Sequence, residues 1–295
     1  MLLPAKKLKP PKLANSLRST LILDVPSSNF EVTQWLDRAP LTKQDCLAEE
    51  TPVALIYNGV SHAVMLATAA DLEDFALGFS LSEGIVASAG ELYDIEVRVQ
   101  ANGIELHCEI ATERFVQLKA RRRTLAGRTG CGLCGAESLE QAVRYPQPLQ
   151  SVSKFTAASI EHGLRTMQPL QELQKKTGAT HASAYVLADG MVSLVREDVG
   201  RHNALDKLVG AIEKQHLQEG GNVAKADGFI ITTSRASFEM VQKTASAGIS
   251  MLVAVSAPTG LAVRVAEQCG LTLVGFAREG RFVVYSHNER ILNQF

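Results

Sequence analysis

The stretch GFIITTSRASFEMVQKTASAGISMLVAVSAPTGLAVRVAEQCGLTLVGF, residues 228–276, decides the fold of this chain. Continuous apolar runs alternate in it with segments at helical spacing. The runs that predict strands are 228–233, 249–255, 271–276 and, just beyond the stretch, 282–285. The segments that predict helices are 238–247 and 259–269. Apolar strands that alternate with helices are typical of an α/β fold, in which helices cover both faces of a largely parallel sheet.

Working outward, the segment before this stretch also belongs to the α/β part, for which we predict the boundaries 151–295. A helix is predicted over 156–167, and strands over 181–187 and 191–195 surround the turn signal Asp189-Gly190. Another helical pattern covers 204–212. The prolines at 146 and 148 indicate a linker over 145–155.

Residues 51–150 predict a smaller α+β part. Asn58-Gly59 and Asn102-Gly103 each stand between β-rich runs, which is the strongest short-range signal for a β-hairpin. Segment 71–79 has helical spacing with acidic residues in its first turn, and 112–123 also looks helical. Residues 1–50 begin with a lysine- and proline-containing segment, and we expect a flexible basic tail and lead-in there.

Bulk composition narrows the classes of function. The 295 residues are 46% hydrophobic, which supports a sizeable core, and the formal net charge of −1 gives no overall field for nucleic acid or an anionic membrane. Apolar stretches fall well short of the roughly 20 residues that a membrane span needs. Five cysteines at irregular spacing and no recognisable signal peptide predict a reducing, cytoplasmic location.

The chemical centre of the sequence is GCGLCG at residues 130–135. A thiol is a nucleophile only as a thiolate, and basic neighbours or a Cys-x-x-Cys motif lower its pKa. Four arginines precede Cys131 within ten positions, at 121, 122, 123 and 128. The glycines allow close approach to the loop, and the helical pattern at 136–143 would place Cys134 near a helix N-terminus. The motif therefore predicts sulfur chemistry at Cys131 and Cys134.

Other interpretations of this motif remain open on spacing alone. Structural zinc needs four ligands, but the remaining cysteines at 46, 108 and 269 are scattered singly. A thioredoxin-type dithiol switch is compatible with Cys-x-x-Cys, although the βαβ context before it is weak. The glycines also match a dinucleotide fingerprint, but the preceding segment is charged and helix-like instead of an apolar strand.

A second group of polar residues follows predicted strand ends. Residues 196–203, which include His202, form either a structural salt-bridge network or a polar site for ribose, pterin or phosphate. Ser234, Arg235 and Ser237 stand at a helix start after a strand, where they either cap the helix or bind an anion. Arg278 and Arg281 form a similar loop after Phe276. Ligands in open α/β sheets bind beyond the strand C-termini, which favours a site here.

These segments together resemble the formate dehydrogenase accessory sulfurtransferases, the FdhD-type sulfur carrier family. The resemblance covers about residues 51–285 in the family's order. It rests on residues 71–79 with 82–84, 127–135, 197–207, 234–239, and 273–276 with 280–281.

The resemblance implies a function and a fold. Such proteins accept sulfur from a cysteine desulfurase as a cysteine persulfide. The family's persulfide cysteine corresponds to Cys131, and Cys134 is expected to assist the transfer or release of the sulfur. They pass this sulfur to the molybdenum of bis(molybdopterin guanine dinucleotide), which they bind as a substrate. The formate dehydrogenase apoenzyme then needs this cofactor for activity. The cofactor-binding stretch maps onto Phe276, Ala277, Arg278, Glu279, Gly280 and Arg281, although Glu279 is an acid where a small residue is expected. A cytidine deaminase-like mixed sheet, a homodimer and no permanently bound metal are also implied.

Three other functions make different predictions. Zinc deaminases carry an H-x-E motif with a catalytic glutamate, followed by P-C-x-x-C. This sequence departs from that pattern at two residues, because Ser183 stands two positions after His181 in place of the glutamate and no proline precedes the Cys-x-x-Cys. A chaperone that only carries finished cofactor would tolerate changes to the cysteines but not to Arg281. A dithiol oxidoreductase would form a reversible disulfide between Cys131 and Cys134 and act on generic disulfides.

Overall fold

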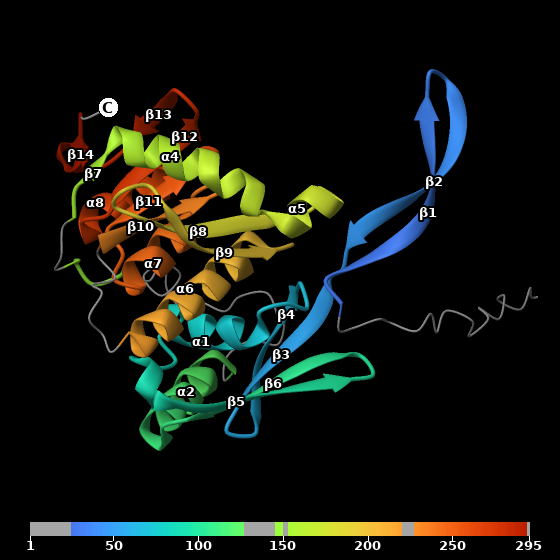
Figure 1. Cartoon of the computed structure of the whole chain (residues 1–295). Helices are drawn as coiled ribbons and strands as arrows, with labels where there is room; N and C mark the ends of the chain where they lie inside the picture. Colours follow the sequence, from blue (N-terminus) through green and yellow to red (C-terminus); the bar gives the residue numbers. More distant parts are fainter. Residues whose placement is uncertain (1–24, 127–144, 150–152, 220–226, 294–295) are drawn as a thin grey trace, which may run out of the picture.

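The structure, a computed structural model, describes residues 25–126, 145–149, 153–219 and 227–293. Two sheets dominate it, and a separate hairpin projects from them (Figure 1). The predicted sulfur residues Cys131 and Cys134, the adjoining Arg128 and the helical pattern at 136–143 lie outside the described residues.

The larger sheet has six strands in the order β13-β12-β11-β10-β8-β9. Strands β10, β11 and β12 pair in parallel, as the 228–276 stretch predicts, whereas β8, β9 and β13 pair antiparallel to their neighbours. The sheet is therefore mixed, and the predicted α/β class is confirmed. The strand bounds are β8 His181–Leu187, β9 Val192–Asp198, β10 Gly228–Thr232, β11 Met251–Ala254, β12 Thr272–Arg278 and β13 Arg281–Val284.

Helices cover both faces of this sheet (Figure 1). Alternate side chains of a strand point to opposite faces, so Ile230 packs in one core while Phe229 and Ile231 pack in the other. The core that contains Ile230 lies under α6 Arg201–Gln218, α7 Phe238–Ser246 and α8 Gly260–Cys269. The core that contains Phe229 lies under α4 Ala157–Met167.

The smaller sheet has four strands in the order β4-β3-β6-β5. Both predicted hairpins are confirmed, and Asn58 and Gly59 have the positive φ angles of 45° and 80° that a tight two-residue turn requires. One face packs against α1 and α2 around Phe75. The bounds are β3 Thr51–Tyr57, β4 Val60–Ala67, β5 Leu92–Gln100, β6 Gly103–Ile110, α1 Leu72–Ser82 and α2 Thr112–Ala126.

Helix α1 joins the two sheets by crossing α6 at two glycines. A Cβ on Gly78 would lie 1.7 Å from the backbone oxygen of Asp206, and a Cβ on Gly210 would lie 2.0 Å from that of Asp74. Beside this crossing, Ser82 Oγ donates to Asp206 Oδ1 at 2.6 Å, and Lys243 Nζ of α7 donates to the same oxygen at 2.9 Å. Close backbone packing and a buried ion pair therefore hold α1 on the larger sheet.

The projecting hairpin is an element that the sequence analysis did not predict. Strands β1 Ser27–Leu36 and β2 Ala39–Ala48 pair along their whole length, where only a flexible tail and lead-in was expected. Its turn consists of Asp37 and Arg38, both at positive φ, so it lacks the Asn-Gly signal of the other hairpins. Residues 1–24 lie outside the described ones.

The remaining elements are short. They are α5 Glu172–Thr177, β7 Phe155–Thr156, β14 Ile291–Leu292 and the 3-10 turns Ala89–Glu91, Gln168–Leu170 and Asn288–Arg290. None of the helices in the described ranges combines the length and the apolar composition needed to span a bilayer.

Candidate functional site at the carboxyl edge of the larger sheet

The sequence-predicted binding residues gather at one edge of the six-stranded sheet. Strands β9, β10, β11 and β12 run in the same direction, so their carboxyl ends meet there, and β8 begins there because it runs the opposite way. His202 follows β9, and Ser234, Arg235 and Ser237 follow β10. Phe276, Ala277 and Arg278 end β12, and Glu279 and Gly280 form the turn to Arg281 of β13. We call this region the carboxyl edge.

Three helices begin at the carboxyl edge (Figure 1). Helices α6, α7 and α8 each follow a strand that ends there, and their N-caps are Gly200, Ser237 and Thr259. The N-terminus of a helix carries partial positive charge and backbone N–H groups without partners in the helix. Three helix N-termini at one edge of the sheet make that edge electrostatically favourable for an anion.

The serines after β10 are only partly explained by capping. Thr259 caps α8 in the usual way by accepting a hydrogen bond from Ala262 N at 3.3 Å. Ser237 occupies the same position in α7, but its side chain makes no capping bond and its buried Oγ has no hydrogen-bond partner among the described residues. Ser234 Oγ instead donates to Arg235 O at 2.9 Å. The Ser237 hydroxyl is therefore available to a ligand.

Two further buried polar atoms at the carboxyl edge have no hydrogen-bond partner in the part of the chain that the structure describes. They are Ser183 Oγ on β8 and Arg201 Nε at the start of α6. Ser183 is directly opposite Thr232 in the ladder, so both side chains lie on the face that α6 and α7 cover. A buried polar atom without a partner is costly in an ordinary structural region, and such atoms at a strand end indicate a place where a ligand or water completes the bonding. Spacing alone did not single out Ser183.

Phe276 is held in a strained backbone conformation at the end of β12. Its φ angle is +51°, which a bulky side chain adopts only when the surroundings impose it, and the register of β12 with β13 shifts between Gly275 and Arg278. Phe276 N donates to Ser256 O at 3.1 Å, and the ring is 48% exposed. The neighbouring Ala277 is buried, so it anchors the bulge and can offer a ligand only its backbone. An exposed aromatic ring on a bulge suits stacking against a flat ring system.

The arginines of this turn are exposed. Arg278 Nη1 donates to Val255 O and to Ala277 O, which directs its guanidinium across the end of β11. Arg281 and Arg235 are exposed as well, so their charges are accessible to an anion. Glu279 is exposed between Arg278 and Arg281 and places one negative charge in this turn.

His202 links the starts of α6 and α7. Its Nε2 lies 2.9 Å from Glu239 Oε2. Burial lowers the pKa of His202, the Glu239 carboxylate opposes this shift, and the positive charges of Arg201 and Lys243 add to it. Burial and then Arg201 also lower the pKa of His181 at the start of β8. Both imidazoles are therefore neutral at pH 7 and act as hydrogen-bonding groups.

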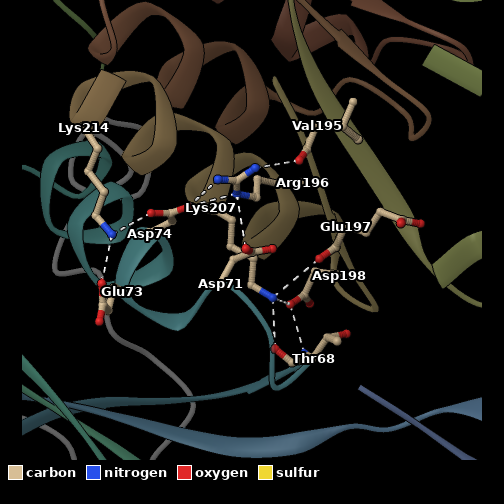
Figure 2. A network of polar contacts seen from close by, with 10 residues as sticks. All are labelled: Thr68, Asp71, Glu73, Asp74, Val195, Arg196, Glu197, Asp198, Lys207 and Lys214. Atoms are coloured by element: carbon tan, nitrogen blue, oxygen red, sulfur yellow. Dashed lines mark hydrogen bonds and ion pairs between the residues drawn. The ribbon is translucent and has the colours of Figure 1, made fainter. Parts of the chain in front are cut away.

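Most of the 196–203 cluster is structural. Asp198 and Lys207 are fully buried and form an ion pair at 2.7 Å (Figure 2). Asp198 also accepts hydrogen bonds from Thr68 N at 2.9 Å, Gly200 N at 2.8 Å and Asn203 Nδ2 at 3.0 Å. This network fixes the start of α6 against the smaller sheet, so Asp198 and Asn203 of the cluster have structural roles.

A neighbouring network extends the same contact between the sheets. Arg196 Nη2 donates to Asp74 at 2.7 Å, and Lys214 Nζ lies 2.7 Å from the other oxygen of Asp74 (Figure 2). Glu197 accepts hydrogen bonds from Leu173 N at 2.8 Å and Gln174 N at 2.7 Å, which satisfies the N-terminus of α5.

The two buried cysteines among the described residues, Cys108 and Cys269, are poorly suited to sulfur chemistry. Burial raises the pKa of Cys108 to about 12 and also raises the pKa of Cys269. A thiol with a raised pKa is a weak nucleophile because little of it is thiolate. Within the described ranges, no group of three or more His, Cys, Asp or Glu side chains is arranged to hold a metal ion.

The fold defines an α/β protein with a mixed sheet covered by helices, and comparisons with known proteins identify its family. The family model FdhD/NarQ matches residues 48–292, so the chain belongs to the FdhD/NarQ family. The sulfur carrier protein FdhD of Cupriavidus necator is 57% identical over 267 residues, which are 90% of this chain and 91% of that protein. The sulfur carrier protein FdhD of Bordetella petrii is 52% identical over 250 residues, or 85% and 88% of the two chains.

A solved structure has the same fold. The crystal structure of a protein from Desulfotalea psychrophila, described as a formate dehydrogenase accessory protein, matches with a TM-score of 0.68. The match covers 90% of this chain and 99% of that one at 24% sequence identity.

Proposed function

We propose that this protein is a cytoplasmic sulfurtransferase that carries persulfide sulfur from a cysteine desulfurase to the molybdenum cofactor of formate dehydrogenase. Family membership and the relatives named sulfur carrier protein FdhD support the sulfur-carrier role. The observation that carries the cofactor part is the convergence at the carboxyl edge of three helix N-termini, exposed arginines, and hydroxyls without a partner among the described residues. The chain's division into a part at 51–150 and an α/β part at 151–295 is part of the same proposal.

Sulfur loading takes place at Cys131 in this proposal. The Cys131 thiolate attacks the terminal sulfur of the desulfurase persulfide, the donor's S–S bond breaks, and the donor cysteine leaves as a thiolate. Cys131 then holds the sulfur as a persulfide, with no net oxidation or reduction. Cys134 assists its release. Arg128 and the arginines at 121–123 stabilise the thiolate by their positive charge.

The carboxyl edge holds the cofactor, bis(molybdopterin guanine dinucleotide), as a substrate. Arg235, Arg278 and Arg281 pair with its phosphates, and the Ser234 and Ser237 hydroxyls and His202 donate or accept hydrogen bonds at the helix starts. Phe276 stacks on a flat ring of the cofactor, and Gly280 lets the turn approach it closely. Glu279 opposes phosphate binding by its negative charge.

The proposal separates sulfur transfer from cofactor binding, and the experiment exploits this. Wild type, Cys131→Ala, Arg235→Ala and Arg98→Ala are purified from cells that make the cofactor, and bound pterin is quantified by its fluorescence after release. Arg98 is the matched control, because it is an exposed arginine on the smaller sheet that pairs with Glu96 at 2.5 Å.

We expect Arg235→Ala to weaken cofactor binding about 10- to 100-fold, the usual cost of one charge-assisted hydrogen bond, whereas Arg98→Ala binds normally. Cys131→Ala should bind cofactor normally and fail to activate formate dehydrogenase apoenzyme. Normal activation by Cys131→Ala would favour a chaperone that carries finished cofactor. If Arg235→Ala and wild type bind the cofactor equally well, the cofactor does not bind at the carboxyl edge.

A further inference from the structure

The smaller sheet has one side that points away from its helices. Helices α1 and α2 pack on the inner face, to which Val53 points. Every second residue of a strand points to the opposite side, which we call the outer sheet face. In the ladder of β3 with β4, Val64 is opposite Ala54 and Leu66 is opposite Pro52. Val64 is 63% and Leu66 is 56% exposed, so the β3–β4 half of the outer sheet face is apolar and open to solvent.

The β5–β6 half of the outer sheet face is acidic. In the ladder of β5 with β6, Asp94 is opposite Glu109 and Arg98 is opposite Glu105. Glu105 is also the neighbour of Ala54 on β3, which places this row on the same face as the apolar half. The charged and titratable residues of this half are Asp94, Glu96, Glu105, Glu109, Arg98 and His107. Four carboxylates therefore accompany one arginine and one histidine.

Part of this negative charge has no counter-charge among the described residues. Arg98 pairs with Glu96 at 2.5 Å. Asp94 and Glu109 instead stand directly opposite each other, and neither carboxylate has an ion pair within the described ranges. Two like charges directly opposite on a sheet repel each other, so a cation over Asp94 and Glu109 would stabilise this pair of strands. The acidic half therefore favours a basic partner.

A hollow lies where the two halves meet. A cavity of about 490 Å³ is lined by Pro52, Ala54 and Val64 of the apolar half and by residues 100–105, which form the β5–β6 turn and its flanks. An exposed apolar patch is typical of an interaction surface, and complementary charge selects its partner. A segment that fits the outer sheet face therefore combines apolar side chains for the cavity with basic side chains for the carboxylates.

Residues 1–24 of this chain have that composition. Their charged residues are Lys6, Lys7, Lys9, Lys12, Arg18 and Asp24, so five basic side chains accompany one acid. Leucines stand at positions 2, 3, 8, 13 and 17, among and around the lysines. The segment therefore places apolar and basic side chains next to each other, as the outer sheet face places apolar and acidic ones.

This segment also joins the described chain close to the outer sheet face. Glu49 N donates to Pro26 O at 3.0 Å, and β3 begins two residues after Glu49, at Thr51. Lys12 precedes Pro26 by 14 residues, which span up to about 46 Å when extended. The outer sheet face is about 26 Å long, from the 8 residues of β6, and about 14 Å wide, from the spacings between four strands. All four lysines can therefore reach the acidic half.

We propose that residues 1–24 dock on the outer sheet face of the same chain. The lysines at 6, 7, 9 and 12 pair with the carboxylates of the acidic half, and one ammonium group lies over the opposed Asp94 and Glu109. The leucines cover the apolar half and the cavity. The segment then acts as an internal ligand that offsets the repulsion between the two carboxylates and removes Val64 and Leu66 from water.

The test is zero-length cross-linking of the full chain. A water-soluble carbodiimide joins a lysine amine to a carboxylate that touches it, so that an amide bond forms and the reagent takes up the water. Mass spectrometry of the digested product then quantifies links from the lysines at 6, 7, 9 and 12 to Glu96 and Glu105, which are retained in every variant. The intact mass shows whether a link lies within one chain or joins two copies.

Two variants and their matched controls probe the two halves of the face. The acidic variant is Asp94→Asn with Glu109→Gln. Its control is Glu113→Gln with Glu172→Gln, which removes the same charge from exposed positions on α2 and α5. The apolar variant is Val64→Ser, and its control is Val116→Ser, a valine on α2 that is 55% exposed. Circular dichroism melts verify that each variant is folded.

Wild type and both controls should form links within one chain from these lysines to Glu96 and Glu105. The acidic variant should form about 3- to 10-fold fewer of them, because it loses two exposed ion pairs although the counted carboxylates remain. The Val64→Ser variant should form about threefold fewer, because less apolar surface is then buried under the leucines.

Several results would overturn the proposal. The absence of links to Glu96 and Glu105 in wild type leaves the outer sheet face to another partner. Links from the lysines to Glu113 and Glu172 at the same frequency mean that the segment has no preferred surface. Links found only in the product with the mass of two chains place the segment on another copy. An equal loss of links in a variant and its control also contradicts docking on this face. If Val64→Ser fails to fold, the acidic variant and its control decide the question.

Discussion

Substitution of Gly78 by alanine tests the crossing of α1 and α6, on which the placement of the smaller sheet depends. The new Cβ would lie 1.7 Å from Asp206 O and 2.7 Å from Gly210 N, whereas real Cβ contacts essentially never fall below 3.0 Å. Both neighbours are backbone atoms, so no side chain can rotate away. The two helices must separate by roughly an ångström or more, which is an overpacking effect at the upper end of about 1–3 kcal/mol.

The expected loss of stability can be expressed as a melting temperature. Alanine in a helix recovers about 1 kcal/mol relative to glycine, which leaves a net loss of about 2 kcal/mol for Gly78→Ala. For a chain of this size the midpoint should fall by about 4–8 °C. The assay is thermal unfolding followed by circular dichroism, with Gly260→Ala of α8 as the control. A Cβ on Gly260 meets only Arg264 Nη1 at 3.6 Å, an ordinary contact, so its midpoint should not fall. A Gly78→Ala midpoint equal to that of wild type would refute the reasoning.

Three further predictions follow from the networks and the carboxyl edge. Lys207→Met should destabilise the fold by about 3–5 kcal/mol in urea unfolding, because it leaves the buried Asp198 carboxylate without its ion-pair partner. Lys214→Met on the same helix should cost about 1 kcal/mol or less, since the pair of Lys214 with Asp74 is partly exposed. Similar losses in the two variants would contradict the structural role given to the Asp198–Lys207 pair. Phe276→Gly should raise the melting midpoint slightly by relieving the positive φ, while it weakens cofactor binding, and unchanged binding would exclude stacking by the ring. Because the pKa of His202 is lowered in the folded chain, the unfolded chain protonates this imidazole at a higher pH than the folded chain does. The free energy of unfolding should therefore fall as the pH drops below about 6.5, the ordinary pKa of histidine. Urea unfolding at a series of pH values should show a shallower fall in His202→Gln.

Local sequence patterns predict most of this fold because its elements carry local signals. The Asn58-Gly59 turn has the backbone angles that such a pair favours, and the alternation over 228–276 corresponds to β10, β11 and β12 with their helices. The β1–β2 hairpin escaped prediction because its turn residues Asp37 and Arg38 adopt left-handed angles although Arg38 stands where a glycine is usual. Local pattern also could not reveal that β8 lies between β9 and β10, because that pairing joins segments far apart in the chain.

The carboxyl edge shows the same division between local and non-local information. Spacing predicted a site at Ser234, Arg235, Ser237, His202 and the turn after Phe276, since each follows a predicted strand, and their role in binding stays a prediction. It could not show that the strand ends meet at one edge, nor that Ser183 and Arg201 lie there with buried atoms that have no partner within the described ranges. Those facts depend on the strand order. The roles of Cys131 and Cys134 stay predictions from the motif and the family resemblance.

The central claim is that Cys131 carries sulfur, and intact-mass spectrometry tests it most directly. Wild type, Cys131→Ala and Cys134→Ala are incubated with a cysteine desulfurase and cysteine, and then weighed with and without reductant. The account predicts a gain of about 32 Da, one sulfur atom, that reductant removes and that is absent from Cys131→Ala but present in Cys134→Ala. A wild-type protein that gains no sulfur, or a Cys131→Ala variant that gains it equally, would contradict the account.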